Sequence, residues 1–187
     1  MRLVLASSSP RRAELLRAAG FDFETLSAAV DEQIRPDERP EEYVLRLASE
    51  KSAAGQSMAR DDAFVLGADT AVVVGTDVLG KPNDDADVAR MLRQLSGRTH
   101  RVITGVSLRR GALEAREIEM TAVWFSTLRS EEIEWYVASG EGRDKAGAYA
   151  IQGRASRFIP RIDGSYSNVV GLPIALVQAL ISALSAS

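Results

Sequence analysis

The sequence predicts an α/β protein with a mixed, bent sheet flanked by helices, arranged as two lobes around a central cleft. Short apolar runs alternate with amphipathic segments over the first hundred residues, which favours strands and helices packed in layers. Two long β-branched stretches, 99–108 and 118–128, follow each other around Gly111 and predict an antiparallel pair. Glycine-rich stretches such as 145–153 have no evident structural role, and a cleft between two lobes would account for them.

Start and stop signals place the elements in order. Proline, aspartate or serine stands at each of the first four expected helix starts, and glycine at each end. The expected helices run from Pro10 to Gly20, Pro40 to Gly55, Asp84 to Gly97 and Ser130 to Gly140, with a fifth from Leu172 onward. Apolar or β-branched runs predict strands at 3–5, 21–26, 63–66, 71–74, 78–79, 99–108, 118–128 and 158–162. The stretch 27–39 is expected to be a loop and 164–168 a turn.

Size and composition limit the classes of protein to be considered. A chain of 187 residues with an apolar fraction of 45% is expected to form one domain, residues 1–187, with its two lobes around one continuous core. A net charge of −3 gives no reason to expect nucleic acid or an anionic membrane as a partner. The absence of cysteine excludes a disulfide framework and a cysteine nucleophile. Without an evident signal peptide or membrane span, we expect a soluble cytoplasmic protein.

The junction between the first strand and the first helix is a candidate phosphate site. Ser7 lies just before the helix N-terminus, where free backbone N–H groups and the helix dipole favour an anion. Arg11 and Arg12 add guanidinium donors whose forked geometry fits phosphate oxygens. An ordinary capped helix with two surface arginines would have the same residues, so this segment alone leaves both interpretations open.

Lysine is rare in this chain and marks three positions. Of 23 basic residues, only Lys51, Lys81 and Lys145 are lysine, which hints at places that need a compact ammonium. Lys51 lies one turn beyond Leu47 on the apolar side of the second helix, so its stem can follow the core while its head reaches a cleft. Lys81 ends a near match to the P-loop pattern in which proline replaces the Mg²⁺-binding hydroxyl residue. That leaves Lys81 as a candidate phosphate lysine in a different geometry.

Carboxylates supply the remaining candidate chemistry. Asp69 follows an apolar strand, where catalytic groups often emerge, and a turn residue that binds its own backbone would give the same pattern. With Asp31, Glu32 and Lys51 it suggests an oxygen-rich site for Mg²⁺ or Mn²⁺. His100 is the only histidine, and without a G-x-S-x-G motif we expect it to be a structural or a solvated residue and not a catalytic one. The amide of Gln152 matches the donor and acceptor edge of uracil or thymine, with a loop glutamine facing water as the alternative.

Seven stretches form a combined pattern that spans nearly the whole chain. They are residues 6–12, 47–51, 67–70, 79–82, 95–100, 145–153 and 164–173. As a set and in this order, they resemble the Maf family of nucleoside triphosphate pyrophosphatases. The resemblance implies a two-lobed α/β fold similar to inosine triphosphatase and a homodimer. It also implies cleavage of a nucleotide to a monophosphate and pyrophosphate with a divalent metal cation, Mg²⁺ or Mn²⁺.

The same resemblance implies roles for individual residues. Asp69 matches the position of the family's proton acceptor. The positions linked to base specificity are matched by Arg11, Thr70 and Gln152. The phosphate and metal neighbourhood is matched by Ser7, Arg12, Glu32, Lys51 and Lys81, with Glu32 and Asp69 as the expected metal ligands.

The resemblance also favours particular substrates. The stretch 145–153 has the form of the branch that acts on dTTP and UTP, standard or modified, in a house-cleaning role. The branch that acts on 7-methyl-GTP differs there and lacks this glutamine pattern. Two alternatives stay open: a pyrophosphatase for a modified purine nucleotide such as 7-methyl-GTP, and a non-catalytic nucleotide-binding regulator of cell division.

Overall fold

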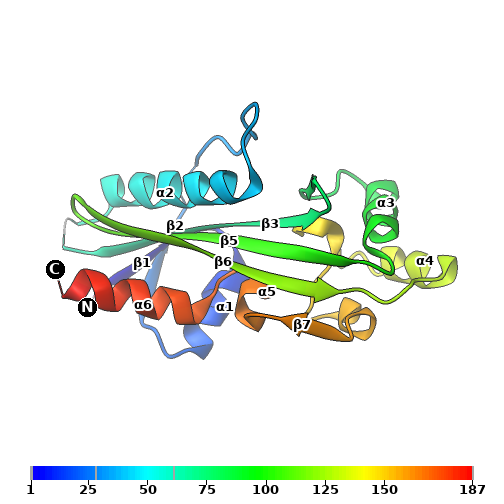
Figure 1. Cartoon of the computed structure of the whole chain (residues 1–187). Coiled ribbons are helices and arrows are strands. Elements are labelled where there is room, and N and C mark those ends of the chain that lie inside the picture. The colour runs from blue at the N-terminus through cyan, green and yellow to red at the C-terminus, as the bar shows by residue number, and fades with distance from the viewer. Residues whose placement is uncertain (1, 28, 61, 187) are drawn as a thin grey trace. The chain divides into compact units, whose positions relative to one another are not determined.

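Seven strands and six α-helices make up the protein in the computed structural model, which describes residues 2–27, 29–60 and 62–186 (Figure 1). Ala28 of the expected 27–39 loop lies outside these ranges. The strands are β1 (Leu3–Ala6), β2 (Phe23–Leu26), β3 (Phe64–Val74), β4 (Asp77–Leu79), β5 (Thr99–Arg110), β6 (Leu113–Trp124) and β7 (Arg161–Asp163). The helices are α1 (Pro10–Ala18), α2 (Pro40–Met58), α3 (Asp85–Leu95), α4 (Ser130–Ala138), α5 (Tyr166–Val170) and α6 (Ile174–Ser185). Two 3-10 helices cover Ala146–Ala148 and Arg154–Phe158.

The strands form one mixed sheet in the order β2-β1-β3-β5-β6-β7, with β4 paired to β3. β1 is parallel to β2 and to β3, in registers that set Leu3 beside Phe23 and Phe64. β4 pairs antiparallel with β3, and β7 pairs antiparallel with β6. The sheet therefore contains both parallel and antiparallel pairs, as the sequence predicted for an α/β fold.

The chain divides into two compact units. Unit 1 consists of Met1–Thr70, Thr104–Glu119 and Gly171–Ser187, and unit 2 of Ala71–Ile103 and Met120–Val170. β3, β5 and β6 each contribute residues to both units. Within the described ranges, no helix has the length and apolar character needed to cross a membrane.

Strand alternation gives unit 1 two helical layers. Leu3 and Leu5 of β1 pack in one apolar cluster with α1 and α6, whereas Val4 and Ala6 belong to a second cluster. The two sets separate because successive side chains of a strand leave on opposite faces of the sheet. Figure 1 shows α2 on one side of the unit 1 strands and α6 on the other.

The core of unit 2 is built from strand residues, α3, α4 and an aromatic cluster. His100 is buried, and its Nε2 lies 2.7 Å from the hydroxyl oxygen of Tyr149. The ring of Phe125 lies beside it in a tilted arrangement, with 5.7 Å between the ring centroids. Burial lowers the pKa of His100 to about 4. Of the two roles expected for His100, structural or solvated, its burial in the core supports the structural one.

Two glycines expected to end secondary structure lie inside it. Gly67 is part of the continuous β3, where the sequence predicted two strands, and a Cβ there would lie 2.2 Å from the carbonyl oxygen of Ala48 in α2. Gly55 lies inside α2, which continues to Met58, and a Cβ there would lie 2.8 Å from Ala6. Both positions require glycine because a neighbouring backbone or strand comes very close, so glycine marks helix–sheet packing here and not a boundary.

The last third of the chain differs most from expectation. The predicted strand 158–162 is wrong in its first part, because Phe158 ends a 3-10 helix and β7 begins only at Arg161. The predicted turn at 164–168 is largely the short helix α5. β6 begins at Leu113, several residues before the expected 118, because the polar residues that follow the turn at Gly111 continue the strand.

Candidate functional site

The candidate site in unit 1 is organised by the end of the β3 segment that belongs to it. Gly67 faces α2, so Asp69, two residues later, leaves the sheet on the same side and meets Lys51 of that helix. Thr70 leaves on the opposite side and meets Arg12 of α1. Two successive residues of one strand thus carry a carboxylate and a hydroxyl to different cations.

Lys51 joins two carboxylates from distant parts of the chain. Its Nζ lies 2.6 Å from Oδ1 of Asp69 and 2.6 Å from Oε1 of Glu32. Lys51 and Asp69 are each only 8% exposed, whereas the side chain of Glu32 is 53% exposed. Because a buried charge is costly without a partner, the ammonium and the Asp69 carboxylate serve as each other's ion-pair partner. Together, the side chains of Lys51, Asp69 and Glu32 carry a formal charge of one negative unit, and Glu32 is the one that is open to solvent.

Arg12 forms the second cationic part of the site. Its Nε donates to the carbonyl oxygen of Gly171 (2.9 Å), its Nη1 to Oγ of Ser7 (3.3 Å) and its Nη2 to Oγ1 of Thr70 (3.2 Å). Desolvation lowers the pKa of Arg12, while the charges of Asp69 and Glu32 act in the opposite direction. The guanidinium remains charged, since arginine does not lose its proton in proteins. The fork is held by three acceptors and keeps further N–H donors for an anion.

The serines before α1 contact one another and Arg12 instead of capping the helix. Ser9 occupies the N-cap position of α1, yet its side chain makes no capping hydrogen bond. Its backbone N–H instead donates to Oγ of Ser7 (3.2 Å), the same oxygen that accepts from Arg12. Ser7 is thereby fixed between the helix start and the guanidinium.

Sequence reasoning missed two groups that hold this arrangement. Oγ1 of Thr104, in β5, lies 2.9 Å from Oγ1 of Thr70, and the carbonyl oxygen of Gly171 accepts from both Thr70 and Arg12. Gly171 adopts φ 129°, a conformation that favours glycine. A glycine that directly follows two valines could have indicated a special backbone conformation at position 171. Nothing in the sequence distinguishes Thr104 from other threonines in β-strands.

A third missed residue, Tyr43, borders the carboxylates. Its hydroxyl donates to the backbone carbonyl of Glu32 (3.1 Å). Burial and the charges of Asp69 and Glu32 raise the pKa of Tyr43 to about 12. Nothing in the sequence marks Tyr43 as a site residue, because its spacing on the second helix is equally typical of a core residue.

The other candidates lie in both units. Arg11 belongs to α1 and its charge acts on Arg12, so it shares the unit 1 neighbourhood. Lys81 and Gln152 belong to unit 2, and both side chains are exposed. Lys145, also in unit 2, donates to the carbonyl oxygen of Glu141 and pairs with Asp144. Unit 1 therefore brings together Ser7, Arg11, Arg12, Glu32, Lys51, Asp69 and Thr70.

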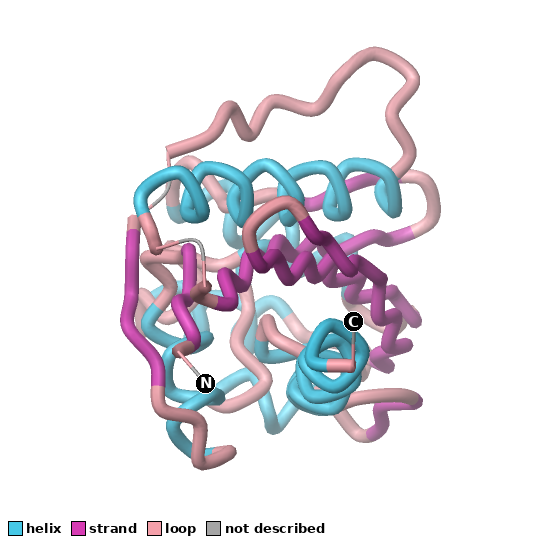
Figure 2. Tube along the Cα trace, turned by 90° about the vertical axis from the view of Figure 1, so that its left-hand side faces the viewer, coloured by secondary structure: helices cyan, strands magenta, loops and turns pink. Residues whose placement is uncertain are grey.

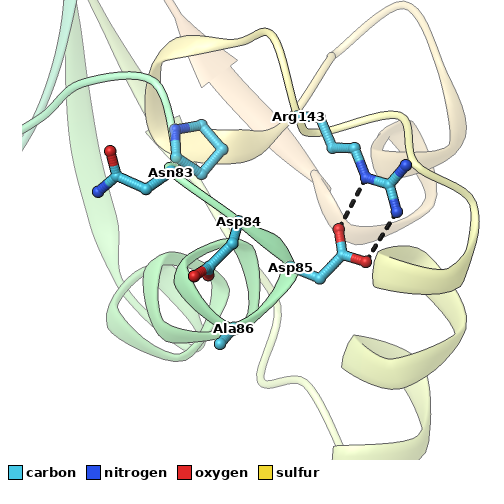
Figure 3. Close-up of a pocket in the computed structure, with 6 residues that line it drawn as sticks. Asn83, Asp84, Asp85, Ala86 and Arg143 are labelled. Atoms are coloured by element: carbon cyan, nitrogen blue, oxygen red, sulfur yellow. Dashed lines mark hydrogen bonds and ion pairs between the residues drawn. The ribbon is translucent and has the colours of Figure 1, made fainter.

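A shallow pocket of about 490 Å³ in unit 2 has a different character. Figure 3 shows it at the start of α3. There Nε and Nη2 of Arg143 donate to the two carboxylate oxygens of Asp85, each at 2.7 Å. Its lining consists of Pro82, Asn83, Asp84, Asp85, Ala86 and Arg143. This lining includes none of the candidate residues, and its most prominent charges neutralise each other.

The donor set for a metal consists of two carboxylates. Among the described residues, no group of three or more His, Cys, Asp or Glu side chains is gathered as a metal site. Glu32 and Asp69 nevertheless converge on one ammonium, each at 2.6 Å. Mg²⁺ is commonly held by one or two carboxylates, with substrate phosphates and water as the other ligands. The oxygen atoms of these two carboxylates are the type of ligand that a hard divalent cation takes.

A family model and the curated relatives point to the same family. The family model for Maf-like protein matches residues 2–184. A dTTP/UTP pyrophosphatase of Methylococcus capsulatus is 52% identical over 174 residues, which cover 93% of this chain and 86% of that protein. A second, from Anaeromyxobacter dehalogenans, is 51% identical over 184 residues, covering 96% and 92%. The solved structure of the Staphylococcus aureus Ham1 protein has a similar fold, with a TM-score of 0.54, 16% identity and coverage of 98% and 99%.

Proposed function

We infer that this chain, which belongs to the Maf family, is a nucleoside triphosphate pyrophosphatase that hydrolyses dTTP and UTP to the nucleoside monophosphate and pyrophosphate. The observation that carries this proposal is the buried pair of Lys51 and Asp69 with Arg12 in the same neighbourhood. A triphosphate needs concentrated positive charge, and hydrolysis needs a proton acceptor. The relatives named dTTP/UTP pyrophosphatase supply the substrate class.

Asp69 is the proposed general base. Its Oδ1 accepts a hydrogen bond from Nζ of Lys51 at 2.6 Å, which holds the carboxylate in place. Water attacks the α-phosphorus, its proton passes to Asp69, and the bond between the α-phosphorus and the bridging oxygen breaks as pyrophosphate leaves. Lys51 orients the carboxylate through its contact with Oδ1.

The phosphates are proposed to bind the cations at the start of α1. Arg12 is pre-oriented by Ser7, Thr70 and Gly171, so little side-chain freedom is lost when an anion binds. The N-terminus of α1 adds backbone donors and the positive end of the helix dipole. Lys81 of unit 2 is assigned to the same task by the family resemblance.

A divalent cation, Mg²⁺ or Mn²⁺, is proposed to be held by Glu32 and Asp69. When bound, such a cation offsets the negative charge on the phosphate oxygens and on the leaving pyrophosphate. The hard oxygen chemistry of the two carboxylates supports this choice over a softer metal. The resemblance further supports a homodimer, which size-exclusion chromatography with light scattering would test. The proposed cytoplasmic location would be tested by cell fractionation.

Base selection is proposed for Arg11, Thr70 and Gln152. An amide such as that of Gln152 both donates and accepts, so it can pair with O4 and N3–H of uracil or thymine. Thr70 already contacts Arg12, which would couple base selection to phosphate binding.

A nucleotide panel with pyrophosphate detection tests this proposal. The purified protein is assayed with Mg²⁺ and with Mn²⁺ against dTTP, UTP, 5-methyl-UTP, 7-methyl-GTP and the common triphosphates. We expect pyrophosphate release to be fastest with the uracil and thymine nucleotides. Preference for 7-methyl-GTP would point to the modified-purine alternative, and absence of release with every nucleotide would point to a non-catalytic nucleotide-binding protein.

A further inference from the structure

The loop that carries Glu32 is bound along one side of α2. Residues 29–39 connect β2 to α2 and are mostly exposed. Figure 2 shows this loop passing along the outer side of α2. The helix residues that hold it are Tyr43, Arg46 and Glu50, which share one face of α2 because they are three and four residues apart.

Arg46 and Glu38 form the strongest of these contacts. Nε and Nη2 of Arg46 donate to the two carboxylate oxygens of Glu38, at 2.5 and 2.8 Å. Their side chains are only 13% and 9% exposed. Exposed ion pairs contribute little, whereas a forked, desolvated arginine–carboxylate pair has both geometry and strength. The same arginine also pairs with Glu50 at 3.3 Å.

Helix α2 also holds the backbone next to Glu32. Nη2 of Arg46 donates to the carbonyl oxygen of Gln33 (3.0 Å), and the Tyr43 hydroxyl donates to that of Glu32 (3.1 Å). The loop is closed on itself by the backbone N–H of Arg35, which donates to Glu38 (3.0 Å). Two consecutive carbonyl groups are thus fixed from α2, and from there the Glu32 side chain reaches Lys51 at 2.6 Å.

We propose that Arg46 and Glu38 act as a clamp that positions Glu32 for the divalent cation. The inference rests on the proposed function, because it takes Glu32 to be a metal ligand. A free loop of this length would spread Glu32 over many positions, and cation binding would then have to order it. With the clamp in place, the loop is already ordered in the folded protein before a cation binds. Arg46, Glu38 and Tyr43 are positioning residues, and none of them contacts the reacting atoms.

The variants that test the clamp are Arg46→Gln on the helix side and Glu38→Gln on the loop side. Glu38→Gln lies outside α2, so it tests the clamp even if the helix variant folds poorly. The matched control is Arg39→Gln, which removes an arginine–carboxylate pair with Glu42 at 2.8 Å that is exposed, at 71% and 53%. The double variant Arg46→Gln with Glu38→Gln measures whether the two residues act as one unit.

Two measurements are made on each variant. Amide hydrogen exchange of residues 29–38, without metal or nucleotide, reports whether the loop is released. Pyrophosphate release from dTTP against Mn²⁺ concentration separates metal affinity from kcat. Loss of a residue that orients a metal ligand costs about 10- to 100-fold in metal affinity. We expect faster exchange and a rise of about that size in the half-saturating Mn²⁺ concentration, with kcat at saturating Mn²⁺ within about twofold of wild type.

The outcomes separate the clamp from the proposed function. Faster exchange with a raised Mn²⁺ requirement in both clamp variants and their double, but not in Arg39→Gln, supports the clamp. Unchanged amide exchange in the clamp variants overturns the clamp. Faster exchange with an unchanged half-saturating Mn²⁺ concentration also overturns it. So does an effect of equal size in the Arg39→Gln control. If wild type releases no pyrophosphate from any nucleotide, the proposed function fails first. If wild type is active and Glu32→Gln leaves the Mn²⁺ requirement unchanged, the metal role of Glu32 and the clamp with it are wrong.

Discussion

Lys51 and Arg12 show, at the scale of single residues, why this site uses two kinds of cation. The compact ammonium of Lys51 lies between two carboxylates at 2.6 Å from each, a position that a planar guanidinium would fill less well. Arg12 uses its fork to reach three oxygens from separate segments. This geometry explains why position 51 is lysine in a chain whose basic residues are mostly arginine.

Asp69→Asn should remove turnover while nucleotide binding is largely kept. The amide cannot accept a proton, and loss of a positioned general base costs about 10²- to 10⁴-fold in rate. Pyrophosphate release gives kcat, and calorimetry with dTTP gives the dissociation constant. Asp62→Asn, an exposed carboxylate before the same strand, serves as the control. Wild-type rates in the Asp69 variant would remove this residue from the role of base.

Gln152→Ala should change the order of preferred nucleotides more than it slows a good substrate. A site that pairs with a base edge loses discrimination when its donor and acceptor are removed. The check is the ratio of kcat/KM for dTTP to that for dCTP and dATP, with Gln178→Ala on α6 as the control glutamine. An unaltered base profile would argue against base reading by Gln152.

At the scale of secondary-structure elements, the distance between α2 and the sheet decides whether Lys51 reaches Asp69. Gly67 of β3 and Gly105 of β5 both face α2, and a Cβ at Gly105 would lie 2.4 Å from the carbonyl oxygen of Val44. Two glycines on neighbouring strands thus let the helix backbone lie directly on the sheet. The side chain of Lys51 can then enter the strand layer instead of ending above it.

Gly67→Ala should therefore disturb both stability and the site. The added methyl would lie 2.2 Å from the Ala48 carbonyl oxygen and 2.6 Å from the Ser52 backbone nitrogen, so α2 must move. Such overpacking costs about 1–3 kcal/mol, and a larger loss of kcat follows if Lys51 withdraws from Asp69. Denaturant unfolding and pyrophosphate release measure the two effects. Gly80→Ala is the control, since a methyl group there would have no described atom within 4 Å, and equal behaviour of the two variants would contradict this account.

Secondary structure was predictable where local signals and packing agree. The helix starts at Pro10 and Pro40 and the N-cap at Asp84 follow the expected residue types. The expectation failed at Gly55 and Gly67, because local propensity treats glycine as a breaker while here it admits a neighbouring element. The helix α5 was missed because it is too short to show a periodic pattern.

At the scale of the whole molecule, acid sensitivity comes from both units. In unit 2, the folded-state pKa of His100 is lowered from 6.5 to about 4 by burial. The unfolded chain therefore takes up a proton first, so stability present above pH 6.5 is lost as pH falls toward 4. In unit 1, Arg46 lowers the pKa of Glu38 to about 2, so its contribution is lost between about pH 4.5 and 2.

His100→Gln should weaken the pH dependence of the unfolding free energy between about pH 6.5 and 4. The amide does not titrate and can still pair with the Tyr149 hydroxyl, so the variant loses the His100 contribution to the pH dependence of unfolding. For one group the full change between pH 7 and 4 amounts to about 3 kcal/mol. Urea unfolding at intervals across this range measures it. A wild-type pH profile in the variant would assign the acid sensitivity to other groups.

The sequence by itself determined the residue types, the order of the main elements and the family, because these depend on local pattern and on motifs read along the chain. Only the tertiary structure decided which candidates meet. Parallel pairing of β1 with β3 brings the α1 start beside the β3 segment, and α2 lies close enough for its lysine to reach Asp69. Such contacts depend on strand register and on the approach of two backbones, quantities that no local stretch of residues encodes alone.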